Sequence, residues 1–239
     1  MGDTPTIVIT NMSNNDLTTR TLLMSKKKDG VLVVSRGSNA NYDAAATDAS
    51  TGRSQIRAFD LTQRPAGRPY NFGSEGVRLG WGLRNSVGVA EEPTTGGIYS
   101  VENGIDDMTR NGQDIHENNP GEELNFHGTV TDTTDRGNYG YPLCFALWDT
   151  NIPDVGGLKV GDQFSMVQNS TVNDTACRTN FVAPRLTLPA HTAPLGITFN
   201  GDGSQAFISF HGSCKLLSWV YRHQVESWAL GSTLNMAVK

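Results

Sequence analysis

Polar residues flank one hairpin-like stretch of the chain, and their types suit the binding of a ligand. Arg84 and Asn85 precede a short apolar run, and the polar cluster 102–107 follows the next apolar run. The two runs surround the Gly-rich turn 95–97, which predicts an antiparallel hairpin. Because both polar groups lie at the outer ends of this hairpin, we expect them to meet at one rim of a sheet. The sequence therefore predicts a binding site on a β scaffold.

The same hairpin pattern occurs twice more. Residues 20–25 and 31–34 flank the turn Asp29-Gly30, and residues 193–199 and 206–210 flank the turn Asp202-Gly203. The interval between the second and third hairpins is long enough for two units of roughly 50 residues, the period of propeller repeats. A β-propeller places one such sheet in each blade and gathers strand ends at one mouth. An ordinary β-sandwich with three similar hairpins is the alternative.

Composition favours a single all-β domain. The chain has 239 residues, of which 37% are hydrophobic, and it contains 26 glycines and 10 prolines. Helical periodicity is missing before the C-terminal tail, so strands and turns are expected instead. The formal net charge of −5 and the lack of a basic stripe argue against nucleic-acid and anionic-membrane partners.

Cysteine usage and glycosylation acceptors indicate an exported protein, although no apolar signal segment is present in this chain. Cys144 and Cys177 flank a polar loop and could pair in an oxidising compartment, which would leave Cys214 unpaired. The alternative is that all three are free thiols. Three Asn-X-Ser/Thr acceptor sites begin at Asn11, Asn169 and Asn173.

Further strands are expected at residues 6–10, at residues 55–61 and within residues 137–150. The loop 108–120 carries almost no apolar residue. Long polar loops in compact domains are more often functional than incidental.

Six short segments together resemble a known family. They are TRTL (19–22), VSRGSNAN (34–41), GLRNSVG (82–88), PGEELN (120–125), AHTAPLGITF (190–199) and FISFHGS (207–213). In this order they resemble the soluble quinoprotein glucose/sorbosone dehydrogenases, and most closely the fungal pyrroloquinoline-quinone (PQQ)-dependent pyranose dehydrogenases. The resemblance covers residues 16–213.

The resemblance implies a six-bladed β-propeller with PQQ over its central mouth and a calcium ion that bridges cofactor and protein. The implied reaction is oxidation of a sugar at its anomeric carbon, with hydride transfer to the quinone and removal of the hydroxyl proton by a base. A pyranose substrate, an external electron acceptor and an extracellular location follow from the same resemblance.

The resemblance also assigns roles to individual residues. It gives cofactor contacts to Arg84, Asn85, His191 and His211, and metal contacts to Gly104, Ile105, Glu122 and Glu123. Arg84 matches an arginine at the quinone carbonyl, where its fixed charge would stabilise charge that develops on oxygen, a catalytic role. For each position, the alternative is an ordinary polar residue at a strand end.

Two departures from the family pattern predict impaired turnover. Leu17 stands where the family has a histidine that looks like the catalytic base, and leucine cannot accept a proton. After Ser213 the family pattern breaks off, and the N-terminus begins partway into the propeller. We therefore expect an incomplete propeller of about four blades in residues 1–213. Residues 214–239 read as an amphipathic helix in a tail of uncertain structure outside the propeller.

Two other functions stay open at this point. One is a non-catalytic extracellular propeller that binds a sugar or a protein, which the leucine at position 17 favours. The other is a calcium-dependent lactone hydrolase, because such propellers also use acidic residues at a central metal. Arg84-Asn85 and the segment around His191 favour the quinone enzyme over the hydrolase.

Overall fold

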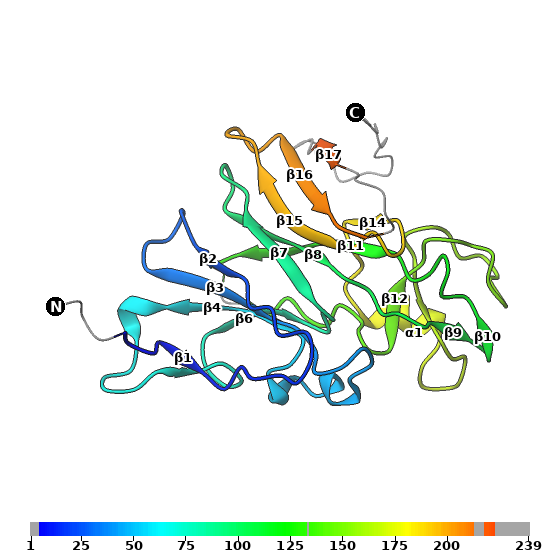
Figure 1. Cartoon of the computed structure of the whole chain (residues 1–239), viewed down its shortest axis with the longest axis horizontal. Coiled ribbons are helices and arrows are strands. Elements are labelled where there is room, and N and C mark those ends of the chain that lie inside the picture. The colour runs from blue at the N-terminus through cyan, green and yellow to red at the C-terminus, as the bar shows by residue number, and fades with distance from the viewer. Residues whose placement is uncertain (1–4, 133, 213–217, 223–239) are drawn as a thin grey trace.

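Most of the regular secondary structure in the described part of the chain is antiparallel strand (Figure 1). The computed structural model describes residues 5–132, 134–212 and 218–222. Its strands are β1 (Ile9–Thr10), β2 (Leu22–Met24), β3 (Val31–Arg36), β4 (Gln55–Asp60), β5 (Tyr70–Asn71), β6 (Val77–Trp81), β7 (Ser86–Glu91), β8 (Gly97–Glu102), β9 (Thr109–Arg110), β10 (Gln113–Asp114), β11 (Glu122–Thr129), β12 (Cys144–Ala146), β13 (Gln163–Ser165), β14 (Leu186–Leu188), β15 (Pro194–Phe199), β16 (Gln205–Phe210) and β17 (Ser218–Arg222). The helical segments are η1 (Ala44–Thr47), η2 (Ala49–Thr51), η3 (Leu61–Gln63) and α1 (Asp174–Asn180).

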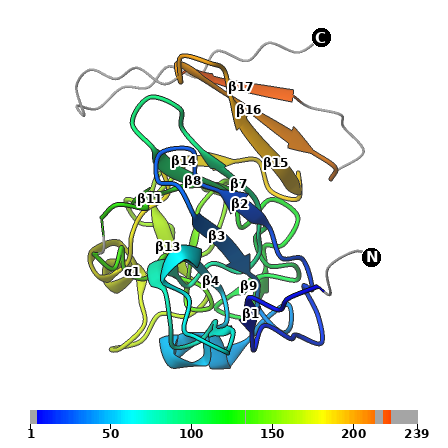
Figure 2. The ribbon, with the colours of Figure 1, turned by 90° about the vertical axis from the view of Figure 1, so that its left-hand side faces the viewer.

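Three larger sheets follow one another in chain order (Figures 1 and 2). The first has the strand order β2-β3-β4-β6, the second β14-β11-β8-β7 and the third β15-β16-β17. The pairs β12-β13, β9-β10 and β1-β5 form small two-stranded sheets within the described residues, and β1-β5 is the parallel one. Strand β7, at the edge of the second sheet, packs against β2 and β3 of the first sheet and against β15 of the third.

Apolar side chains from alternate strand positions fill the spaces between the sheets. Val31 and Val33 of β3 point toward the second sheet, whereas Leu32 and Val34 point to the opposite face and pack with Ile9. Both faces of β3 are therefore buried, because successive side chains of a strand point to opposite faces and all of them are covered here. A second interface, between the second and third sheets, contains Tyr99, Val101, Leu124, Leu188, Ile208 and Phe210.

A close backbone approach joins the second and third sheets. A Cβ atom placed on Gly88 of β7 would lie only 3.0 Å from the Cα of Gly196 in β15 and 2.6 Å from Val101 Cγ2. Glycine at position 88 therefore lets these two inner strands approach more closely than a larger residue would.

All three hairpins predicted from the sequence are present. They are β2-β3, β7-β8 and β15-β16, and each is antiparallel. The predicted strand 55–61 is β4, and the predicted strand within residues 137–150 is the short β12. The predicted strand 6–10 is shorter than expected, because only Ile9 and Thr10 pair.

Two segments differ from the sequence-based expectation. Residues 218–222, predicted as helix, form β17 and pair antiparallel with β16, so this part of the tail extends the third sheet. Backbone pairing with an exposed sheet edge outweighs the weak helical pattern there. Residues 151–184, for which the sequence predicted no element, contain strand β13 and the short helix α1. Cys214 lies outside the described residues.

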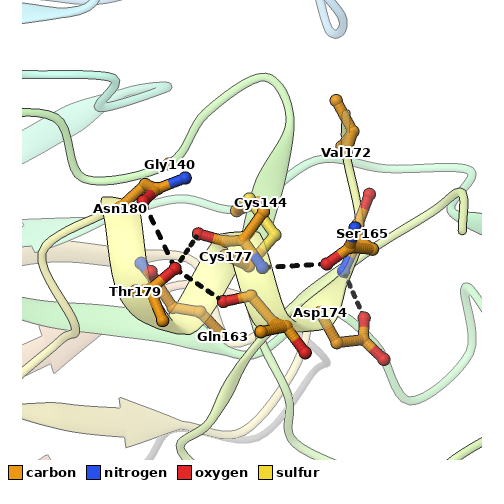
Figure 3. The surroundings of a disulfide bond; sticks show 12 residues. Gly140, Cys144, Gln163, Ser165, Val172, Asp174, Cys177, Thr179 and Asn180 are labelled. Carbon is orange, nitrogen blue, oxygen red and sulfur yellow. Dashed lines mark hydrogen bonds between the residues drawn. A yellow bond between two sulfur atoms is a disulfide. The ribbon is translucent and has the colours of Figure 1, made fainter. Parts of the chain in front are cut away.

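The predicted pairing of Cys144 with Cys177 is confirmed, and the disulfide ties α1 to the β12-β13 hairpin (Figure 3). The two cysteines are 33 positions apart. Closing a loop of that length removes conformational entropy from the unfolded chain worth about 3–4 kcal/mol. The bond therefore stabilises a region that has only short strands and one short helix.

A buried histidine makes the stability of this core dependent on pH. His127 of β11 is fully buried, its Nε2 lies 2.8 Å from Ser100 Oγ, and its ring centroid is 4.8 Å from that of Tyr139. Burial, with a smaller contribution from the charge of Arg136, lowers the pKa of His127 to about 3. The unfolded chain binds this proton near pH 6.5, so the unfolded state is favoured progressively as the pH falls from 6.5 toward 3.

We expect His127→Gln to reduce the loss of stability in mild acid. Between pH 6.5 and pH 4.5 the neutral histidine accounts for a loss of about 2–3 kcal/mol, at roughly 1.4 kcal/mol per pH unit. Glutamine can keep the hydrogen bond to Ser100 and does not titrate. Urea unfolding of both proteins across this range measures the difference, and parallel pH profiles would contradict the assignment.

Candidate functional site

Four loops next to strands of the three larger sheets meet at one end of the strands. They are residues 37–41 after β3, 82–85 before β7, 103–106 after β8 and 189–193 before β15. Backbone hydrogen bonds join them, from Ser38 N to Arg84 O at 2.8 Å and from Asn103 N to Asn85 O at 3.2 Å. The Asn103 side chain also donates to Pro194 O at 2.7 Å. The rim predicted for the hairpin β7-β8 is therefore a junction of all three larger sheets.

Arg84 lies at the centre of this junction and is 7% exposed. Its Nε donates to Asn41 O at 3.1 Å, and its Nη1 donates to Asn103 O at 3.3 Å. Its Nη2 donates to Asn41 Oδ1 at 2.8 Å and reaches Asp106 Oδ2 at 3.3 Å. The guanidinium is thus held rigidly by two loops. Such a preorganised cation can stabilise negative charge on a ligand without moving.

Asp106 links Arg84 to His191. Its second carboxylate oxygen, Oδ1, lies 3.7 Å from His191 Nδ1, and the Nε2 of His191 contacts His116 O. The Asp106 side chain is 63% exposed and that of His191 is 31% exposed, so this part of the junction faces solvent. The structure therefore places His191 beside Arg84, at the open side of the site.

Gly104 and Ile105 line a small pocket behind this open side. The pocket has a volume of about 20 Å³, and its walls include Arg84, Glu102 and Glu123. Within the described residues, the carbonyl oxygens of Gly104 and Ile105 accept no hydrogen bond. Oxygen donors of this kind suit a hard cation such as calcium. The volume is enough for one water molecule or one ion, whereas a tricyclic quinone would have to lie outside the pocket.

Three glutamates are buried beside the pocket. Glu102 ends β8, Glu122 and Glu123 begin β11, and the register places Glu102 directly opposite Glu123. Burial raises the pKa of Glu102 to about 8 and the pKa values of Glu122 and Glu123 to about 7. Glu123 Oε2 accepts a hydrogen bond from Asn125 Nδ2 at 2.9 Å. In the part of the chain that the structure describes, no group of three His, Cys, Asp or Glu side chains has the arrangement of a metal site. The metal role of the two β11 glutamates therefore stays a prediction.

The remaining predicted positions also lie close to the junction. The backbone N–H of His211 donates to Ala193 O at 3.1 Å, and the His211 side chain is exposed. A Cβ atom on Gly37 would lie 2.8 Å from Asn85 Oδ1 and 3.3 Å from Leu17 Cβ. Leu17 and Asn85 are therefore near neighbours, although the individual roles predicted for all these residues are not tested by the geometry alone.

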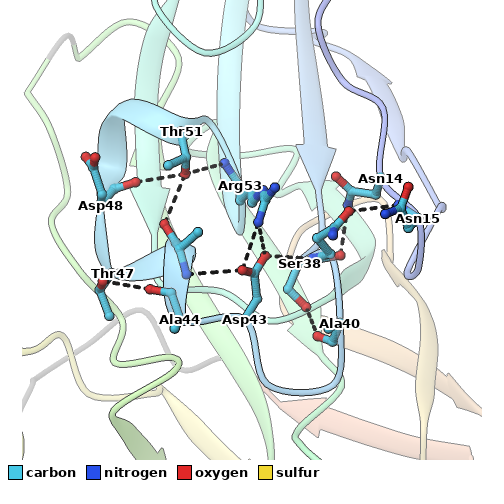
Figure 4. A network of polar contacts seen from close by, with 12 residues as sticks. Asn14, Asn15, Ser38, Ala40, Asp43, Ala44, Thr47, Asp48, Thr51 and Arg53 are labelled. Carbon is cyan, nitrogen blue, oxygen red and sulfur yellow. Dashed lines mark hydrogen bonds and ion pairs between the residues drawn. The ribbon is translucent and has the colours of Figure 1, made fainter.

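Asn41 was not singled out from the sequence as a site residue, yet it holds the guanidinium of Arg84. It belongs to a loop that Asp43 orders (Figure 4): the Asp43 carboxylate accepts from Asn39 N at 2.9 Å and from Arg53 Nη1 at 2.9 Å. The Tyr141 hydroxyl, which contacts Asp43 N at 2.6 Å, fixes the loop from the other side. The Asn-rich segment 39–41 within the family-like piece VSRGSNAN is the signal that could have identified Asn41.

Successive antiparallel sheets whose strand ends meet at one junction define the class of protein. It has a fold of the β-propeller type, like the enzymes that are its structural neighbours. The chain belongs to the TrAA12-like family, whose family model matches residues 1–221.

Similarity to individual proteins agrees with this assignment. The chain is 54% identical over 216 residues to a "Pyrroloquinoline quinone-dependent sugar dehydrogenase" of Hypocrea jecorina (strain QM6a), covering 88% of this chain and 50% of that protein. It is 36% identical over 212 residues to a "Pyrroloquinoline quinone-dependent pyranose dehydrogenase" of Coprinopsis cinerea, covering 86% of this chain and 29% of that protein. The chain thus spans half or less of the length of these curated relatives.

Solved structures show the same fold. The iodide structure of a Trichoderma reesei carbohydrate-active enzyme of family AA12 matches with a TM-score of 0.85 and 51% identity, covering 91% of this chain and 56% of that one. A calcium structure of Trichoderma reesei family AA12 matches with a TM-score of 0.82 and 52% identity, covering 88% and 53%. The holo form of the pyranose dehydrogenase PQQ domain from Coprinopsis cinerea matches with a TM-score of 0.85 and 34% identity, covering 92% and 56%.

Proposed function

We propose that this chain forms part of a PQQ- and calcium-dependent dehydrogenase that oxidises a pyranose at its anomeric carbon. The observation that carries the proposal is that Arg84, Gly104 and Ile105 line one small pocket where the strand ends of a propeller of this family meet. The relatives named above depend on the same quinone. An external electron acceptor would complete the reaction.

The residues present fit this cofactor pair. The Gly104 and Ile105 carbonyl oxygens offer hard ligands to calcium beside a pocket of ionic size. Glu122 and Glu123 lie nearby, and a bound cation would favour the ionised form of their carboxyl groups. Arg84 offers a fixed cation to an anionic quinone, with Asn85, His191 and His211 as further polar groups at the same mouth. When bound, the quinone supplies a hydride acceptor. The protein's contribution is the position and charge of these groups.

In the proposed reaction, removal of the sugar hydroxyl proton is the step for which the family's base is missing at position 17. Leu17, beside Asn85, carries no group that can accept a proton. The neighbouring Asp16 uses its Oδ1 to accept the Leu17 N–H at 2.8 Å and is exposed. Loss of a general base lowers rates by about 10²–10⁴-fold. We therefore propose that this chain turns over slowly, and a non-catalytic binding function is the second candidate for the same reason.

The proposed location is extracellular. A disulfide persists in oxidising compartments, and Asn11 and Asn169, which begin two glycosylation acceptor sites, are exposed. None of the helices in the described part of the chain has the length and apolar character needed to cross a bilayer. The net charge of −5 supports a function without nucleic acid or anionic membrane.

The proposal is tested by adding calcium and PQQ to the purified chain and measuring quinone binding and dye reduction with several pyranoses. We expect calcium-dependent quinone binding with slow dye reduction, and a gain of about 10²-fold or more for Leu17→His. Binding without reduction in both proteins would support the non-catalytic function. Absence of quinone binding in the presence of calcium would overturn the proposal, and hydrolysis of a lactone would favour a hydrolase instead.

A further inference from the structure

The carboxylate of Glu122 joins two loops of the mouth that come from different sheets. Its Oε2 accepts a hydrogen bond from Gly104 N at 2.5 Å, and its Oε1 accepts one from Ala193 N at 3.2 Å. The residue is 5% exposed. A buried carboxylate is retained only when its oxygens have partners, and here both partners are loop backbone N–H groups.

Glu102 has the same relation to a third loop. Its oxygens accept hydrogen bonds from Asn85 N and from Ser86 Oγ, and the residue is 4% exposed. Asn85 directly follows the central arginine of the mouth. Glu102 and Glu122, two buried glutamates at strand ends, thus accept hydrogen bonds from the backbone of three loops of the mouth, 82–85, 103–106 and 189–193.

The loops they hold are those that carry the proposed cofactor contacts. Gly104 N is one residue away from the Ile105 carbonyl, and Ala193 follows His191 by two positions. His191 and Ala193 both adopt left-handed backbone conformations, with φ angles of 57° and 45°. Non-glycine residues adopt this conformation at a cost, so the loop needs external bonds such as the one to Glu122.

We propose that Glu122 and Glu102 are positioning residues, which set the backbone of the mouth loops so that Asn85, the Gly104-Ile105 carbonyl oxygens and His191 converge. This inference rests on the proposed function for the identity of the ligands. Glu122 acts through the Gly104 and Ala193 amides, and Glu102 acts through the Asn85 amide. The predicted result of losing either carboxylate is a local loosening of its own loops.

Glu92 provides a matched control. It is 1% exposed, and its carboxylate accepts from the backbone N–H groups of Thr94 and Thr95, each at 2.6 Å. It follows β7 at the opposite end of the same sheet from Glu102 and Glu122. Glu92→Gln therefore removes a buried acceptor oxygen from two loop N–H groups at a place away from the mouth.

The first measurement is amide hydrogen exchange of the protein without cofactor, in wild type, Glu122→Gln, Glu102→Gln and Glu92→Gln. Glutamine keeps one acceptor oxygen and turns an NH₂ group toward the second donor. We expect exchange at Gly104 or Ala193 to rise at least about tenfold in Glu122→Gln, and exchange at Asn85 to rise in Glu102→Gln. Glu92→Gln should change neither.

The second measurement is binding of terbium, a luminescent calcium substitute, to the same proteins. Calcium should compete for the site in wild type, and affinity should fall about tenfold or more in Glu122→Gln but not in Glu92→Gln. Unchanged exchange at Gly104, Ala193 and Asn85 would overturn the inference. Altered exchange with no metal binding even in wild type would refute the proposed function and leave the positioning role standing. If Glu122→Gln does not fold, Glu122→Asp, which keeps the charge on a shorter side chain, is read by the same criteria.

Discussion

Arg84→Met is expected to weaken quinone binding by about 10²-fold, since hydrogen bonds to a charged group contribute roughly 1.5–3 kcal/mol each. The substitution removes the fixed cation of the mouth. It also removes the bonds that join Asn41 to Asn103, which keep the two loops together. Asp106 is mostly exposed and can be solvated when its partner is lost, so we expect a smaller effect on folding than on binding.

Two further variants separate charge from geometry. Arg84→Lys keeps the positive charge but not the planar fork, and it should recover only part of the affinity. Arg57 is a comparable buried arginine on β4, with bonds to Gly73 O at 3.1 Å and Glu75 O at 2.9 Å. Arg57→Met should lose stability and keep quinone affinity. Quinone affinity is measured from the quinone absorbance that remains after dialysis. Equal affinity of wild type and Arg84→Met would show that Arg84 does not bind the quinone.

Arg110→Met is expected to lower the free energy of unfolding by about 3–5 kcal/mol, the usual cost of leaving one member of a buried ion pair alone. The Arg110 side chain is 0% exposed and makes two bonds to the Asp174 carboxylate, at 2.9 and 2.8 Å. It also donates to Pro153 O, Asp154 O and Ser165 O, and lies over the Phe164 ring. Its loss leaves several acceptors unpaired at once.

A double-mutant cycle tests whether the ion pair carries this effect. Arg110→Met combined with Asp174→Asn should cost less than the sum of the single substitutions, because the uncompensated buried carboxylate is gone. Urea unfolding of the four proteins gives the coupling energy. Additive effects would mean that the carbonyl contacts of Arg110, and not the pair, stabilise this region.

The hairpins could be predicted because their signals are local. In β7-β8 and β15-β16, apolar residues alternate on either side of a Gly-containing turn. In each hairpin, the turn and the alternation of apolar residues specify the same pairing register. The Arg84 and Gly104 positions follow from the same argument, since they are the two ends of one hairpin. The proximity of Arg84 and Gly104 to His191 does not follow from one hairpin. It could be predicted only by assuming that the strand ends of separate sheets gather at one mouth.

The remaining features depend on contacts between distant residues, which local patterns do not contain. Asn41 lies 43 positions from the Arg84 that it holds, and Glu122 lies 71 positions from Ala193. The seven-residue helix α1 has no apolar periodicity of its own. The buried pair Arg110–Asp174 and the disulfide at Cys177 hold it in place. Strand β17 forms because β16 offers an edge, and its own sequence had suggested a helix.

The disulfide between Cys144 and Cys177 constrains one wall of the pocket at the mouth. Cys144 contributes to the wall of the pocket beside Gly104 and Ile105, together with Phe145 and Tyr141. In a reducing cell interior the two thiols stay separate, and that wall loses its covalent link to α1. Oxidation of the thiols therefore fixes one wall of this pocket. Protein produced in an ordinary bacterial cytosol should therefore be oxidised before its affinity for metal or quinone is compared with that of secreted material.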